Sequence, residues 1–231
     1  MANDTAVTNR FADGHMEYES GRKHFTCDGV GCVTMWGGRD GNNLAAHLQQ
    51  SVDSHKHTIE DLAHLTNRYL VEDYRPHETE MDDCGYHVGG FTSAGEPRLY
   101  HIFWNLPGSP AARDNQGAYS FQHHHPSALE TRFLFNGRND LLQYVLWPIL
   151  NEIDQGQSGR FRPDLEGRVR AAHFALRFGA EITREVSPPF LLHLINRRGK
   201  VVSRHFAALV PITDAEVIDL VAEAGLDPAT T

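Results

Sequence analysis

The sequence predicts an α+β fold in which two antiparallel sheets stack and helices lie outside them. Three observations predict it. Short apolar and aromatic runs, bounded by turn residues, have the length and composition of β-strands. Longer stretches repeat their apolar residues at helical spacing. The predicted helices come in pairs between blocks of strands, whereas a parallel sheet would alternate strand and helix singly.

The first half of the chain predicts a hairpin, two helices and up to four further strands. Asp28 and Gly29 lie between two apolar runs and are typical of a hairpin turn. Thr58 and Asp61 are spaced as a helix N-cap and its third-position partner. The expected elements are strands 23–26 and 30–36, helices about 41–52 and 58–73, and strands 85–91, 98–104, 118–123 and 131–136.

The second half predicts two helices, a hairpin and a last helix. Pro148 should kink or stop the first of these helices. Thr213 and Glu216 are spaced as a capping box, so the last helix should begin there. The expected elements are helices 139–152 and 164–185, strands 190–196 and 200–206, and a helix at about 213–225. We expect residues 1–231 to form a single domain.

Composition restricts the function classes. Of the 231 residues, 40 % are hydrophobic and 10 % aromatic, which is enough for a sizeable core and excludes a disordered chain. The formal net charge of −9 argues against a nucleic-acid partner. No stretch approaches the roughly 18 consecutive apolar residues of a membrane span, so no membrane partner is expected. A start without a secretory signal, together with three sparse cysteines, predicts a cytoplasmic protein with reduced thiols.

Four segments, in a fixed order, carry a family resemblance. They are 2–8 (ANDTAVT), 21–25 (GRKHF), 34–38 (TMWGG), and the pair 89–91 (GGF) with 97–102 (PRLYHI). Together they resemble the proteasome β-subunit branch of the N-terminal nucleophile hydrolases, from residue 2 to about residue 206. The resemblance implies a four-layer αββα sandwich, hydrolysis of amide or peptide bonds, and assembly into homo-oligomers.

The same resemblance implies a site. Lys23 would lower the pKa of a nucleophile by its positive charge, and Asp4 would pair with Lys23. The backbone N–H of Gly37 would stabilise a developing oxyanion. The residues implied to bind the substrate, a peptide or small-molecule amide, are Thr8, Met35 and Gly38. No cofactor is implied.

The nucleophile itself leaves two explanations open. In the resembled family it is the first residue of the mature chain, a Thr, Ser or Cys. Here only Met1, Ala2 and Asn3 precede Asp4, so the chain as written is expected to be inactive. Either the complete gene product carries the nucleophile upstream and is a threonine-type peptidase or amidohydrolase, or the protein is a noncatalytic scaffold or binding subunit with the same fold.

Histidines and cysteines offer a weaker alternative. His123 with His125, and His55 with His57, are candidate metal ligands, but no further ligand follows at a recognised spacing. Cys27 and Cys32 span the predicted turn, and no second cysteine pair exists. Polar loop or strand-edge histidines are therefore favoured, and no metal is expected.

Overall fold

The computed structural model describes residues 1–4, 6–10, 13, 16–37, 41–74, 83–105, 119–124, 139–157, 159–184, 186–207 and 209–226. The chain divides into two compact units. The first unit contains Met1–Gly21, Ala128–Leu194 and Val202–Thr231, and the second contains Arg22–Ser127 and Ile195–Val201.

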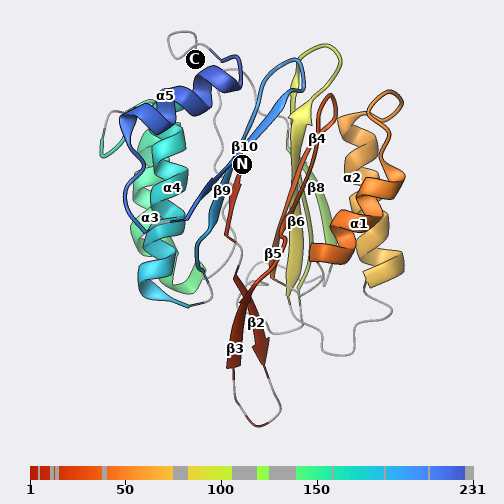
Figure 1. Ribbon diagram of the computed structural model, residues 1–231, viewed down its shortest axis with the longest axis horizontal. Helices are drawn as coiled ribbons and strands as arrows, with labels where there is room; N and C mark the ends of the chain where they lie inside the picture. Colours follow the sequence, from red (N-terminus) through yellow and green to blue (C-terminus); the bar gives the residue numbers. More distant parts are fainter. Residues whose placement is uncertain are drawn as a thin grey trace. The chain divides into compact units, whose positions relative to one another are not determined.

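Five strands of the second unit form an antiparallel sheet in the order β4-β5-β6-β7-β8. Two helices and a π-helical turn cover one face of this sheet (Figure 1). The strands are β4 His24–Cys27, β5 Gly31–Gly37, β6 Cys84–Phe91, β7 Pro97–Trp104 and β8 Tyr119–His124. The helices are α1 Gly41–Ser51 and α2 Ile59–Arg68, and the π-helical turn is η1 Tyr69–Tyr74.

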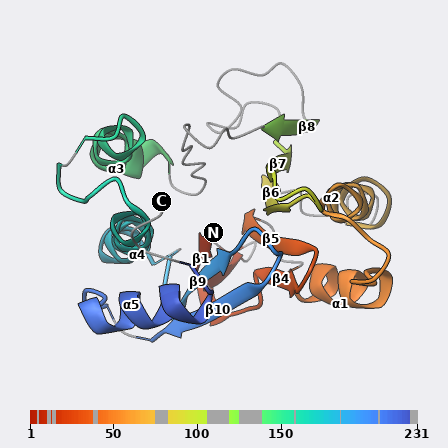
Figure 2. The ribbon, with the colours of Figure 1, turned by 90° about the horizontal axis from the view of Figure 1, so that it is seen from above.

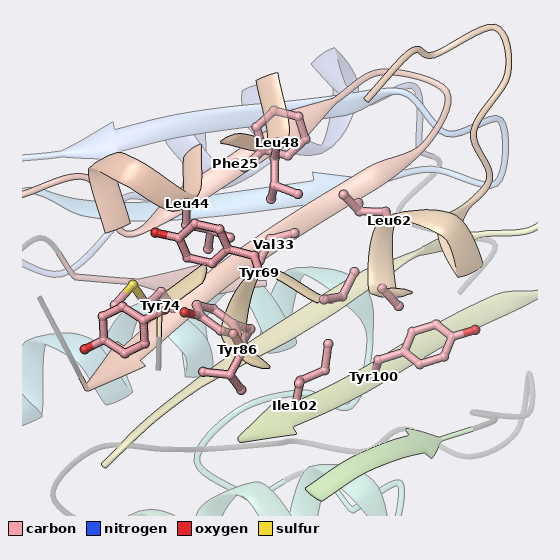
Figure 3. Close-up of a cluster of buried hydrophobic side chains, with 14 of the residues drawn as sticks. Phe25, Val33, Leu44, Leu48, Leu62, Tyr69, Tyr74, Tyr86, Tyr100 and Ile102 are labelled. Carbon is pink, nitrogen blue, oxygen red and sulfur yellow. The ribbon is translucent and has the colours of Figure 1, made fainter. Parts of the chain in front are cut away.

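The main core of the second unit lies between this sheet and its helices (Figure 3). Alternate residues of β4 to β7 face the helices, among them Phe25, Val33 and Tyr86. Leu44 and Leu62 meet them from α1 and α2. Because side chains alternate across a strand, the residues between these core positions lie on the opposite face of the sheet.

The β4–β5 turn is held by the tip of a second hairpin within the same unit. Gly29 donates its N–H to the carbonyl of Gly199 at 3.0 Å, and Asp28 Oδ1 accepts the N–H of Val201 at 2.8 Å. A Cβ on Gly199 would lie 2.9 Å from Gly29 Cα, and Gly199 has a φ of +79°. Both constraints require glycine at this close approach.

Three strands of the first unit form a sheet in the order β1-β9-β10, and two more form the antiparallel pair β2-β3. Figures 1 and 2 show β1, β9 and β10 running side by side, with α4 and α5 nearby. The strands are β1 Ala2–Asn3, β2 Ala6–Arg10, β3 Met16–Ser20, β9 Phe190–Ile195 and β10 Val201–Phe206. The helices are α3 Asn139–Asp154, α4 Leu165–Ile182 and α5 Asp214–Glu223.

Two apolar clusters hold the first unit together. Phe190 and Leu192 of β9 pack with Val169 of α4 and with Leu220 of α5, so both helices cover one face of the three-stranded sheet. On another side of α4, Phe174 packs with Leu146, Leu150 and Ile153 of α3. Helix α4 therefore lies between the sheet and α3.

Most predicted elements are confirmed, within a few residues at their ends. The mixed α+β class with antiparallel sheets is confirmed, and so are both capping boxes, Thr58–Asp61 and Thr213–Glu216. The predicted strand 131–136 lies outside the described residues. Strands β1, β2 and β3 were not among the predicted elements. No helix in the described ranges combines the length and apolar character that a bilayer crossing requires.

Candidate functional site

Two of the predicted site residues lie at the same end of the β4–β5 pair. Lys23 directly precedes β4, and its carbonyl accepts the N–H of Met35 at 2.9 Å. Gly37 ends β5 two residues further on. Gly37 has a φ of +60°, and a Cβ there would lie 1.9 Å from the Asp83 carbonyl oxygen, so this strand end requires glycine. The roles proposed for Lys23 and Gly37 stay predictions.

The other predicted residues belong to several different elements. Asp4 follows β1 in the first unit, whereas Lys23 belongs to the second unit. Thr8 lies in β2 opposite Tyr18 of β3. Met35 is only 4 % exposed and packs in the core beside the helices, and Gly38 lies outside the described residues. The ion pair of Asp4 with Lys23 and the substrate contacts of Thr8, Met35 and Gly38 stay predictions.

A polar network that the sequence did not predict crosses the three-stranded sheet of the first unit. His193 is 1 % exposed and uses both ring nitrogens. Its Nδ1 lies 2.7 Å from Ser203 Oγ, and its Nε2 lies 2.9 Å from Asn3 Oδ1. We call these three residues the Asn3–His193–Ser203 network.

The backbone explains why the three side chains meet. Leu192 of β9 and Val202 of β10 belong to the core under α4 and α5, so the next residue of each strand, His193 and Ser203, projects from the opposite face. Asn3 pairs with Leu191 in the β1–β9 ladder, which places its side chain diagonally beside His193. The network therefore occupies the face of this sheet that α4 and α5 leave uncovered.

A second polar row crosses the five-stranded sheet of the second unit, on the face away from α1 and α2. Backbone register aligns one residue from each strand: His24, Thr34, His87, His101 and Gln122. The rings of His87 and His101 contact each other with centroids 4.6 Å apart. We call these five residues the histidine row.

Two histidines of the row have pKa values below the ordinary range. Burial, and then the neighbouring His101 and His124, lower the pKa of His87 from an ordinary 6.5 to about 3. Burial and His124 lower the pKa of His101 to about 4. Both imidazoles are therefore neutral near pH 7.

Sequence patterns contain signals for both features. His193 interrupts the apolar run Phe190–Ile195, which is the signature of a buried polar residue that needs partners. His87 and His101 each stand between two core residues of their strands. The candidate metal ligands predicted from the sequence are instead pairs of histidines two positions apart. Of these, His123 stacks on Tyr100 with ring centroids 4.2 Å apart, and the Nδ1 of His57 accepts the N–H of Asp53.

A metal site needs three or four ligating side chains that converge on one point. In the part of the chain that the structure describes, no group of three or more His, Cys, Asp or Glu side chains is arranged in this way. Among the described residues, Cys27, Cys32 and Cys84 are not joined in a disulfide. Burial raises the pKa of the Cys32 thiol to about 12, so this thiol is protonated and inert near pH 7.

The fold defines an α+β protein that builds each of its two larger antiparallel sheets with helices on one face. Solved structures of Anbu proteins match it over 97 % of this chain. Anbu from Hyphomicrobium sp. strain MC1 has 16 % sequence identity and a TM-score of 0.57, with 88 % of its chain covered. The helical assembly of the Anbu complex from Pseudomonas aeruginosa has 19 % identity and a TM-score of 0.57, with 87 % covered. Anbu (ancestral beta-subunit) from Yersinia bercovieri has 14 % identity and a TM-score of 0.60, with 87 % covered.

These findings correct the family resemblance. No protein-family model and no curated protein matches the chain. The reported structural matches are Anbu proteins and not proteasome β-subunits, so the resemblance to the proteasome β-subunit branch was wrong. The four short segments that suggested it do not by themselves identify the family. What is shown is an Anbu-like fold at low sequence identity.

Proposed function

We propose that this protein is a homo-oligomeric subunit of Anbu-like architecture. The observation that carries the proposal is the structural likeness over 97 % of the chain to a protein solved as a helical assembly. The proposal includes the single four-layer αββα domain that the sequence predicts. It is supported by the helices that cover one face of each of the two larger sheets.

Exposed apolar side chains of the first unit supply surfaces for a second copy of the chain. On α3, Tyr144 is 76 % exposed and Trp147 is 61 % exposed. Leu209 and Val210, which precede α5, and Ile218 within α5 are exposed as well. Aromatic residues are enriched in protein interfaces. Two different apolar surfaces on one chain fit a head-to-tail contact, which generates rings or helical filaments.

Light scattering coupled to size-exclusion chromatography tests the assembly. We expect the wild-type chain to elute as a multimer whose mass rises with concentration. Trp147→Glu should shift the population towards the monomer. Ile182→Glu is the matched control, because Ile182 is also exposed and apolar but lies at the end of α4. A wild-type monomer at all concentrations, or equal effects of both variants, would reject the proposal.

A second candidate function is hydrolysis of a peptide or small-molecule amide in the cytoplasm by an N-terminal nucleophile mechanism. One observation favours it: Lys23 and the left-handed Gly37 lie at the same end of the β4–β5 pair. A cation and a backbone N–H at one strand end are what a nucleophile and its oxyanion require. Asp4 would complete this site by holding Lys23 charged.

Turnover of fluorogenic peptidyl amides by the protein made from its own genomic locus tests this second candidate. The intact mass and N-terminal sequence of that protein identify its first residue. Lys23→Ala should lower turnover by roughly 100-fold or more, as expected when a catalytic group is removed. Lys56→Ala is the control, because Lys56 is a surface lysine paired with Asp53. Equal turnover of both variants would remove Lys23 from the mechanism.

A further inference from the structure

The Asn3–His193–Ser203 network fixes which nitrogen of His193 carries the proton. Asn3 Nδ2 donates to the Asp4 carbonyl at 2.8 Å, so Asn3 presents its amide oxygen to the histidine. An amide oxygen accepts only, so His193 Nε2 must carry the hydrogen and donate it. In the neutral imidazole, Nδ1 then holds a lone pair, and the Ser203 hydroxyl donates to it at 2.7 Å.

This direction of the two hydrogen bonds is the one that an activated serine needs. A base accepts the hydroxyl proton, and a third group holds the base in the required tautomer. His193 is fully enclosed, whereas Ser203 is exposed, so the base is shielded and the hydroxyl is accessible. A network that only satisfied a buried histidine would not require an exposed partner.

Backbone hydrogen bonds also fix the direction of the Ser203 N–H. The hairpin turn pairs Asn196 with Lys200, and three steps back along each strand bring His193 opposite Ser203. Both backbone groups of His193 are bonded to Met1, its N–H to the Met1 carbonyl and its carbonyl to the Met1 amine, each at 2.7 Å. His193 and Ser203 thus form a non-hydrogen-bonded pair, in which side chains are closest.

It follows that Ser203 directs its own N–H away from β9. Among the described strands, β10 is the outer strand of its sheet, so this N–H points to an open edge. The backbone N–H of a nucleophilic serine is one of the donors that stabilise an oxyanion in acyl transfer. Ser203 therefore carries both groups, a hydroxyl bonded to His193 and a backbone N–H that β9 does not take up.

We propose that Ser203 is the nucleophile of an acyl-transfer site that accepts small carboxylic esters with good leaving groups. Ser203 Oγ attacks the ester carbonyl carbon while its proton passes to His193 Nδ1. The carbon–oxygen bond to the leaving alcohol breaks, and His193 returns the proton to that alcohol. Water then attacks the acyl-serine, again with His193 as base, which releases the acid and restores Ser203. Asn3 acts as a positioning residue.

This site is independent of the proposed functions. It uses residues of the first unit alone and requires no residue at the start of the chain as nucleophile. Covalent labelling of Ser203 and turnover of peptidyl amides are separate measurements, so the failure of this site and the failure of the amide-hydrolase candidate are distinguishable.

A small fluorophosphonate is the probe, because a reactive serine displaces its fluoride and keeps the phosphonyl group. Mass spectrometry of the peptide digest should locate the adduct on Ser203, and 4-nitrophenyl acetate should give a burst of one nitrophenol per chain. Ser203→Ala should abolish both signals, while Ser20→Ala, which changes an exposed serine of β3, should alter neither. Adduct formation elsewhere, or none on Ser203, would overturn the proposal.

Variants of the supporting residues separate activation from folding. His193→Gln should slow phosphonylation of Ser203 by about 100-fold, the usual contribution of a general base. Asn3→Ala should slow it as well, and Asn3→Asp should restore the rate, because a carboxylate also accepts from Nε2. Circular dichroism verifies that each variant is folded. Wild-type rates in folded His193→Gln, or no rescue by Asn3→Asp, would leave Ser203 an ordinary hydroxyl and refute the proposal.

Discussion

The contacting imidazoles of His87 and His101 show how a single pair of residues can tie stability to pH. They stand opposite each other on β6 and β7, and burial disfavours their charged forms. In the unfolded chain each would take up a proton near pH 6.5, but in the folded protein only near pH 3 and 4. Below pH 6.5 the unfolded state therefore binds more protons than the folded state.

Stability should consequently fall as the pH drops. We expect the free energy of unfolding to be insensitive to these histidines above pH 6.5. Below it, each histidine should lower that free energy by about 1.4 kcal/mol per pH unit. The loss should level off near pH 4 for His101 and near pH 3 for His87. Urea unfolding at pH 7 and pH 5 measures it.

Comparison of two variants isolates the effect from carboxylate titration. His101→Gln should lose less stability than the wild type between pH 7 and pH 5. Gln49→Ala, which changes an exposed residue of α1 that does not titrate, should behave as the wild type. Identical pH dependence in all three proteins would contradict the assignment.

Gly37 gives a second prediction at the level of one residue. Gly37→Ala should lower the free energy of unfolding by roughly 2 kcal/mol or more, because it combines a left-handed backbone with a clash against the Asp83 carbonyl. Gly156→Ala is a matched control: its φ is +69°, but no atom lies within 4 Å of the added Cβ. Gly156→Ala should lower the free energy of unfolding by about 1 kcal/mol. Chemical denaturation measures both, and equal losses would show that the contact with Asp83 relaxes freely.

Among the helices, the two capping boxes make matched local contributions. Thr58 Oγ1 accepts the N–H of Asp61 at 3.2 Å, and Thr213 Oγ1 accepts the N–H of Glu216 at 3.3 Å. Thr58→Ala and Thr213→Ala should each lower the free energy of unfolding by about 1 kcal/mol, as measured by thermal or urea unfolding. Ser54→Ala is the control for an exposed hydroxyl outside any helix. If neither cap variant loses stability, helix packing alone determines where these helices begin.

Local patterns predicted these helices well because capping and turn chemistry act within a few residues. Elements that depend on distant packing were predicted less well. Pro148 lies inside α3 and does not stop it, because Leu150 and Ile153 beyond it pack against α4. The predicted helix at 58–73 changes at Tyr69 into a π-helical turn, which still buries Leu70 and Tyr74.

The candidate sites also divide into residues that local sequence could predict and residues that only distant pairing brings together. Gly37 at a strand end was predictable from its neighbours. The Asn3–His193–Ser203 network was not, because 190 positions separate Asn3 from His193 and only the β1–β9 pairing brings them together. The histidine row likewise depends on the register of five strands, which single-strand patterns do not specify.

At the level of the whole molecule, the path of the chain links the two units. It passes from one unit to the other after Gly21, Ser127, Leu194 and Val201. The last two passages lie within β9 and β10, so one hairpin belongs to both units. Unfolding of either unit would therefore release the ends of strands that belong to the other.

This chain path predicts a single cooperative unfolding transition, which would support the proposed single domain. The three tryptophans report on it separately, because Trp147 belongs to the first unit and Trp36 and Trp104 belong to the second. In urea, a variant that keeps only Trp147 and a Trp147→Phe variant should each have the same midpoint by fluorescence as by circular dichroism. Within either variant, separated midpoints would show that the units unfold independently. Asp28→Ala removes the acceptor of the Val201 N–H at the hairpin tip. In each tryptophan variant it should lower the fluorescence midpoint and the circular dichroism midpoint equally, because the loss of one contact destabilises a cooperative structure as a whole.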